Sequence, residues 1–183
     1  MTYWFSNRLS MHVRPAMASD LPALHPLIER AYRGDSARTG WTHEADLLAD
    51  PRTDMESLAA IVRDPAQRLL VALDGAGIPI GCVNIADQGG GLSYLGLFCI
   101  EPRRQAAGLG RRLLAAAEDH AARLFGAKVM EMTVIDSRHE LIAWYDRRGY
   151  FPTGEKRPFP IPLDPPYRMA VLAKPLAIRP DLG

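Results

Sequence analysis

The chain has 183 residues, of which 48% are hydrophobic and 23% charged, a composition typical of one globular domain with a buried core. Its formal net charge is +1, so nucleic acid and anionic membranes are not expected partners, and any attraction for a polyanionic ligand must be local. No apolar run reaches the ~20 residues of a membrane-spanning helix.

The ends of the chain and its two cysteines suggest where the protein resides. Residues 1–10 lack a long apolar core and a small-residue cleavage site, so they do not form a signal-peptide pattern. Cys82 and Cys99 both lie in apolar, strand-like runs, which favours buried free thiols over a disulfide. We therefore expect a cytoplasmic protein with an N-terminal extension over 1–10, one domain over 11–176 and a tail over 177–183.

The amino-terminal part of the domain is predicted to be mostly helical. After a short edge strand at 12–15, Ser19-Asp20 offers an N-cap for a helix with one apolar face. That face consists of Leu21, Leu24, Leu27, Ile28 and Ala31. Two further helices are predicted over 42–48 and 53–63.

Three strands in meander order follow these helices. Residues 68–73 and 78–86 are β-like, and Asp74-Gly75-Ala76-Gly77 between them predicts a hairpin turn. A turn at Gly89-Gly90-Gly91 leads to a third strand over 93–100.

A long helix comes next, beginning after Gly108 and ending before Gly126, which is a suitable C-terminal cap. Its apolar stripe consists of Leu109, Leu113, Ala117, Ala121 and Leu124. The following strand, 128–135, is predicted to run parallel to strand 93–100, because a helix connects the two.

The carboxy-terminal part is predicted to contain one more helix and two more strands. The helix covers 140–148 and is ended by Gly149, after which Tyr150-Phe151 begins a strand. The segment 152–166 holds six of the fifteen prolines and is predicted to be a loop. Residues 168–173 form the last strand, so the order of elements indicates a mixed α/β fold.

The most informative stretch connects strand 93–100 to the long helix. It contains the spacing Gln105-x-x-Gly108-x-Gly110, preceded by Arg103 and Arg104. Free backbone N–H groups, a helix N-terminus and glycines that allow close approach together make an anion site. The stretch is neither a Rossmann fingerprint nor a Walker loop, because Leu113 stands at the third glycine position and no Gly-Lys-Ser/Thr follows.

This spacing resembles the acyl-CoA loop of the GNAT (GCN5-related) N-acetyltransferase family. A second match lies in 142–150, where Tyr145 to Tyr150 resembles the family's closing pattern Tyr-x-x-x-Gly-Phe/Tyr. The likeness extends from Val13 to Lys174. It implies a GNAT-type α/β fold: a central mixed, mostly antiparallel sheet, helices on both faces and a splayed parallel strand pair.

The resemblance implies acetyl-CoA as the acyl donor and assigns its binding residues. Loop amides would wrap the pyrophosphate, and the exposed strand backbone would pair with pantetheine and polarise the thioester carbonyl. The residues so implied are Phe98, Cys99, Ile100, Arg103, Arg104, Gln105, Ala106, Ala107, Gly108, Leu109, Gly110 and Arg111. Arg112 is not included among these residues.

Tyr145 is the expected catalytic acid, since it matches the family tyrosine near the coenzyme sulfur and a phenol is a suitable weak acid. The alternative is a tyrosine packed in the core. Arg138 stands where the family often has an Asn that binds pantetheine, so Arg138 is expected either to contact the coenzyme or to cap the helix. Cys99 as a covalent nucleophile is the weaker interpretation, because no base is paired with it.

The sequence identifies the general base less clearly than the catalytic acid. Glu44 is the first candidate because Trp41 beside it can line an acceptor pocket, and Asp46 and Glu131 are alternatives that also suit structural roles. No metal is expected, since His43-Glu44 lacks the second histidine of His-Glu-x-x-His.

The resemblance implies transfer of an acetyl group to a primary amine, which we expect to belong to a small molecule, by direct attack. Two alternatives stay open: acetylation of a protein or peptide amine, and a non-catalytic acyl-CoA-binding domain. The resemblance also makes a homodimer the candidate assembly.

Overall fold

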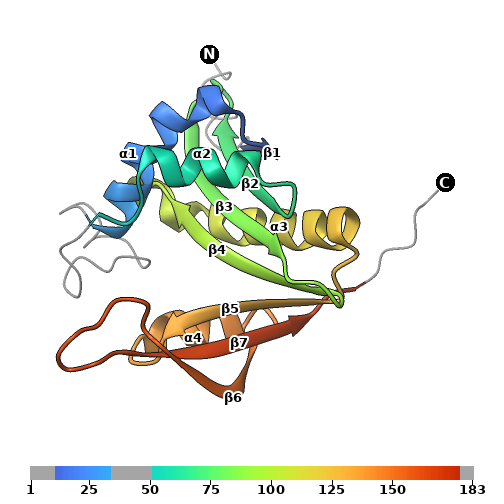
Figure 1. The fold of residues 1–183 in the computed structure, drawn as a ribbon. Coiled ribbons are helices and arrows are strands. Elements are labelled where there is room, and N and C mark those ends of the chain that lie inside the picture. The colour runs from blue at the N-terminus through green and yellow to red at the C-terminus, as the bar shows by residue number, and fades with distance from the viewer. Residues whose placement is uncertain (1–10, 34–50, 178–183) are drawn as a thin grey trace. The chain divides into compact units, whose positions relative to one another are not determined.

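A computed structural model of the chain describes residues 11–33 and 51–177, without the side chains of 105–107 (Figure 1). The chain divides into two compact units. The first unit comprises Met1–Ala86 and Gly96–Asp119, and the second comprises Asp87–Leu95 and His120–Gly183. The boundaries fall before the last residue of β3 (Pro79–Asp87) and inside β4 (Leu92–Ile100) and α3 (Leu109–Phe125), so each of these elements contributes to both units.

Antiparallel strands form the sheet of the first unit. β1 (Met11–Pro15) pairs with β2 (Gln67–Asp74), and β2 pairs with β3 (Pro79–Asp87) through the hairpin predicted from the sequence. The Asp74 carboxylate closes this hairpin by accepting hydrogen bonds from the N–H groups of Ala76 and Ile78, both at 3.0 Å. An aspartate at the start of a turn stabilises it in this way.

Two helices cover one face of these strands, and α3 lies on the other (Figure 1). The two are α1 (Leu21–Tyr32), preceded by the short helix η2 (Ala18–Asp20), and α2 (Met55–Arg63). All five apolar residues predicted for α1 are buried in the core that the helices share with the sheet. Burying such a face, at roughly 25 cal/mol per Å² of apolar surface, holds the helices on the sheet.

The predicted N-cap of α1 acts differently from the expectation. Asp20 occupies the N-cap position, yet its side chain makes no capping hydrogen bond to α1. The carboxylate instead pairs with the Arg14 guanidinium at 2.7 and 2.9 Å and accepts the N–H of Met17 at 2.7 Å. Asp20 therefore joins β1 to the turn before α1 through a bidentate charged pair, a strong type of hydrogen-bonded contact.

The second unit contains the only parallel pair among the described strands. The start of β4 pairs with β5 (Val129–Ile135), and the register covers Leu92–Tyr94 against Val129–Glu131. From Gly96 onward β4 belongs to the first unit. β5 also pairs antiparallel with β7 (Arg168–Pro175), and β7 with β6 (Phe151–Pro158), giving the strand order β1-β2-β3-β4-β5-β7-β6.

The mixed, mostly antiparallel sheet with helices is thus confirmed, but one predicted segment is wrong. Residues 152–158, expected to be loop, belong to β6. The strand order places β6 at an edge of the sheet, where a proline removes no ladder hydrogen bond, so Pro152 and Pro158 are compatible with a strand. The predicted helix 42–48 lies outside the described residues. None of the helices in 11–33 and 51–177 is long and apolar enough to span a bilayer.

Candidate active site

The loop after β4 forms a helix N-terminus with open space in front of it. Residues Pro102–Ala107 form the 3₁₀ helix η4, and Gly108 then adopts a left-handed conformation with φ +71° before α3 begins at Leu109. A Cβ atom built on Gly108 would have no neighbour within 4 Å. The first amides of α3 have no acceptor within the helix, as at any helix N-terminus, so they can bind an anion in that space.

The four arginines near the loop differ in their surroundings. Arg104 pairs with Asp74 at 3.2 Å, and Arg112 donates to the Met11 carbonyl at 3.2 Å. Arg103 and Arg111 are exposed, and no ion pair joins either of them to another residue in the described ranges. Arg103 and Arg111 are therefore the two of these arginines for which the described residues show no partner that an anionic ligand would have to displace.

The end of β4 departs from regular strand geometry. Leu97 has φ +47°, and the alternation of buried and half-buried residues ends there, so that Leu97, Phe98, Cys99 and Ile100 are all buried. A leucine in the left-handed region is uncommon and is retained only where the surroundings enforce it. Side chains take part in this: the Tyr32 hydroxyl donates to the Phe98 carbonyl at 2.7 Å, and the Cys82 thiol to the Leu97 carbonyl at 3.5 Å.

Both cysteines are free and buried, as expected, and their sulfurs are 3.7 Å apart. The hydrogen bond between the two thiols, together with burial, raises the pKa of the Cys82 thiol well above its ordinary value. A thiol without exposure, with no base contacting its sulfur among the described residues, cannot act as a nucleophile. Core packing is therefore the role that the structure supports for Cys99.

This burial has a direct consequence for thiol chemistry. We expect neither cysteine to react with Ellman's reagent in the native protein and both to react once the protein is denatured, because thiolates form only where water solvates them. A spectrophotometric thiol titration with and without denaturant measures this. One rapidly reacting thiol in the native state would contradict the burial and reopen the covalent mechanism.

Tyr145 lies in the second unit, on α4 (His139–Asp146), with 5% of its surface exposed. Its ring meets those of Trp144 and Tyr150 edge-on, with centroids 5.0 and 5.7 Å away. Burial raises the pKa of Tyr145 above its ordinary value, and the nearby Arg148 charge offsets this only in part. The phenol therefore keeps its proton at any working pH and is available as a donor.

The remaining predicted residues fall in two groups. Arg138 occupies the N-cap position of α4, and its carbonyl accepts from the N–H of Ile142 at 3.0 Å, but its side chain makes no capping hydrogen bond. Trp41 and Glu44 lie outside the described residues, as do the side chains of 105–107. Their roles stay predictions.

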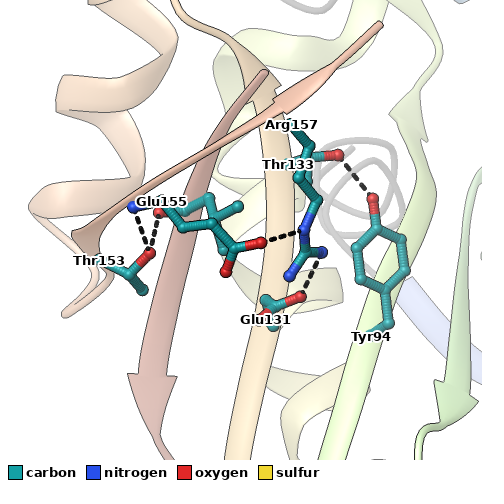
Figure 2. A network of polar contacts seen from close by, with 7 residues as sticks. Tyr94, Glu131, Thr133, Thr153, Glu155 and Arg157 are labelled. Carbon is teal, nitrogen blue, oxygen red and sulfur yellow. Dashed lines mark hydrogen bonds and ion pairs between the residues drawn. The ribbon is translucent and has the colours of Figure 1, made fainter. Parts of the chain in front are cut away.

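Glu131, an alternative base, takes part in a polar network of the second unit (Figure 2). One carboxylate oxygen of Glu131 lies 2.7 Å from Nη1 of Arg157, whose Nε lies 2.7 Å from Glu155. These two hydrogen bonds raise the pKa of Arg157 above its ordinary value. Beside them, the Tyr94 hydroxyl bonds to Thr133 at 2.7 Å. The carboxylate of Glu131 is committed to the guanidinium, which favours the structural interpretation.

Two features of the site were not predicted from the sequence. Nothing in the sequence indicates the left-handed backbone at Leu97, because leucine ordinarily avoids that conformation. Tyr32 follows the apolar stripe of α1 and looks like an ordinary core residue, so nothing marks its hydroxyl as a partner of β4.

Comparison with known proteins agrees with this architecture. The model of the acetyltransferase (GNAT) family matches residues 24–150. The chain therefore belongs to the GNAT acetyltransferase family and is an acyltransferase. No curated protein shows significant sequence similarity to it.

Solved structures show the same fold at low sequence identity. The ribosomal-protein-S18-alanine N-acetyltransferase of Escherichia coli is 17% identical, with a TM-score of 0.71 and coverage of 95% of this chain and 99% of that one. The yncA protein of Salmonella typhimurium, solved with acetyl-CoA, is 19% identical, with a TM-score of 0.69 and coverage of 95% of this chain and 99% of that one. Spermidine/spermine N-acetyltransferase SpeG of Vibrio cholerae is 15% identical, with a TM-score of 0.68 and coverage of 93% of this chain and 95% of that one.

Proposed function

We propose that this acyltransferase moves the acetyl group of acetyl-CoA to a primary amine of a small molecule, by direct attack. The observation that carries the proposal is the loop Pro102–Gly108: a left-handed glycine with open space before it, at the N-terminus of the 17-residue helix α3. A pyrophosphate fits such a site because amides and helix dipole both favour negative charge. The similarly folded yncA protein was solved with acetyl-CoA.

The backbone at the end of β4 is assigned to the thioester end of the donor. Amides of Phe98, Cys99 and Ile100 would pair with pantetheine and stabilise the negative charge that develops on the thioester oxygen. Arg103 and Arg111 would meet the phosphates, whereas Arg104 must first leave Asp74. These residues all belong to the first unit.

The transfer itself needs a neutral amine and a proton for the leaving sulfur. The amine nitrogen attacks the carbonyl carbon, the C–S bond breaks, and the thiolate takes a proton that we assign to Tyr145. The attacking nitrogen loses one proton, for which Glu44 is the candidate base, directly or through water. Trp41 would line the acceptor pocket and Arg138 would contact the coenzyme.

The acceptor is proposed to be a small molecule because of the likeness in fold to spermidine N-acetyltransferase. The proline-rich segment 152–166, predicted to be a loop, is in part the strand β6 and does not contribute to this choice. A protein amine is the second candidate, because the Escherichia coli neighbour is a ribosomal-protein N-acetyltransferase. The two free thiols support a reducing cytosolic location.

Calorimetric titration of acetyl-CoA, followed by mass-spectrometric screening of amines, tests the proposal. We expect binding and acetylation of at least one member of a panel of polyamines, amino acids and amino sugars. Acetylation confined to peptide N-termini would replace the small-molecule acceptor by a protein one. Binding without turnover across the panel would favour an acyl-CoA-binding domain, and failure to bind would refute the acetyltransferase proposal.

A further inference from the structure

The side chain of Arg52, just before α2, lies close to the stretch of β4 that we assign to the thioester. Its guanidinium stands above the ring of Tyr32, 5.0 Å from the ring centroid, a favourable cation–π distance. The Tyr32 hydroxyl in turn donates to the Phe98 carbonyl at 2.7 Å. A single tyrosine side chain therefore links the cation to this stretch, and all three residues belong to the first unit.

An electrostatic effect places the same charge near the end of β4. The hydrogen bond between the two thiols raises the pKa of Cys82, and the positive charge of Arg52 opposes that rise. The Cys82 thiol donates to the Leu97 carbonyl at 3.5 Å. Arg52 therefore acts on two side chains, those of Tyr32 and Cys82, that bond to consecutive carbonyls of β4.

The Arg52 guanidinium is half-buried and has no carboxylate partner in the ranges 11–33 and 51–177. The carboxylate of Glu29 accepts instead from the backbone N–H groups of Arg52 and Thr53, at 2.9 to 3.0 Å. Stacking on a ring uses the face of a guanidinium and leaves its in-plane N–H donors unused. Since a charge that is partly removed from water is normally paired, these donors suit an anionic group of a ligand.

The two faces of this part of the sheet differ in what they can bind. We assign the pyrophosphate of acetyl-CoA to the N-terminus of α3, on the face opposite α1 and α2 (Figure 1). Tyr32, Leu97 and Cys82 belong to the core on the α1 and α2 face. That face, where Arg52 stacks on Tyr32, is therefore the side that remains for the acceptor.

We propose that Arg52 binds a carboxylate of the acceptor, so that the substrate class is an amino acid, a primary amine that also carries a carboxylate. The inference rests on the proposed function and narrows its acceptor. A guanidinium binds a planar carboxylate through two parallel N–H donors, which fixes the orientation of the bound molecule. A polyamine would bring only further positive charge to Arg52, and the likeness to spermidine N-acetyltransferase is one of fold.

Kinetics with matched acceptors test this, each amino acid being compared with its carboxamide, which keeps the amine but lacks the negative charge. The parent should prefer the amino acid. In Arg52→Gln we expect KM for the amino acid to rise on the order of 10- to 100-fold, the worth of hydrogen bonds between charged groups, at nearly unchanged kcat. Both constants for the carboxamide should stay near the parent values. The change in preference between parent and variant cancels the difference in basicity between the two amines.

Arg63→Gln is the matched control, because it removes the same charge from an exposed position in the last turn of α2. It should leave the preference for the carboxylate unchanged. Arg52→Lys keeps the charge without the planar fork and should retain part of the preference, so it serves as the test if Arg52→Gln does not fold. Equal losses with the amino acid and the carboxamide in Arg52→Gln would show that Arg52 only supports Tyr32, and would overturn the proposal.

The outcomes separate this inference from the proposed function. If the parent binds no acetyl-CoA or acetylates no amine, both fail together. If the parent acetylates polyamines or carboxamides as well as amino acids, only the role of Arg52 is refuted. The same holds if the folded Arg52→Gln and Arg52→Lys variants keep the parent's full preference.

Discussion

Replacing Gly108 by aspartate is expected to weaken the binding of acetyl-CoA strongly. The left-handed conformation at Gly108 is one that Asp and Asn adopt more readily than other side chains, and the space before it is open. The new carboxylate would lie where the pyrophosphate is proposed to bind. Charges ~4 Å apart repel by roughly 4 kcal/mol at an effective dielectric constant of about 20, so after screening we expect affinity to fall on the order of 100-fold. Calorimetric titration measures this loss.

Gly108→Asn is the control for this experiment, because it has nearly the same shape as Gly108→Asp and the same tolerance for positive φ without the charge. The asparagine variant should bind acetyl-CoA far better than the aspartate variant, and both should melt at similar temperatures. Equal affinities of the two folded variants would mean that no phosphate lies near Gly108, and the loop assignment would be wrong.

Tyr145→Phe is expected to lower kcat by about 100-fold, the lower end of the range for general acid catalysis. The low end is appropriate because burial raises the pKa of Tyr145, which makes the phenol a weaker acid toward the leaving thiolate. KM for acetyl-CoA should change little, since the hydroxyl acts on the sulfur only as the C–S bond breaks. Steady-state kinetics with an accepted amine gives both constants.

Tyr150→Phe removes the same group from a neighbouring buried ring, 5.7 Å from Tyr145. It should leave kcat near the parent value, which separates loss of an acid from loss of packing. A Tyr145→Phe enzyme with full kcat would assign Tyr145 to the core, the alternative that the sequence left open. The parent should also show no decline in kcat from this residue up to pH ~10, because a raised pKa keeps the phenol protonated there.

The local patterns in the sequence predicted most of the fold because each depends on neighbouring residues. Apolar spacing placed α1 and α3, Asp74 and its glycines placed the hairpin, and Gly126 lies just beyond α3 with φ +62°. The succession of a strand, a small-residue loop and a helix N-terminus was predicted for the same reason, since the three are contiguous in the sequence. The strand segment 152–158 was missed, because its prolines are tolerated only at an edge, and a sequence does not show which strand is at the edge.

The sequence by itself determined the fold class, the position of Gly108 before α3 and the position of Tyr145 on α4. Only the tertiary structure decided which partner each of several polar side chains has. It paired Arg104 with Asp74, paired Glu131 with Arg157, and brought the Tyr32 hydroxyl to the Phe98 carbonyl 66 residues away. The physical reason is that helix and turn formation depends on residues a few positions apart. The direction of a single peptide and the partner of a single charge depend instead on groups that only folding brings together.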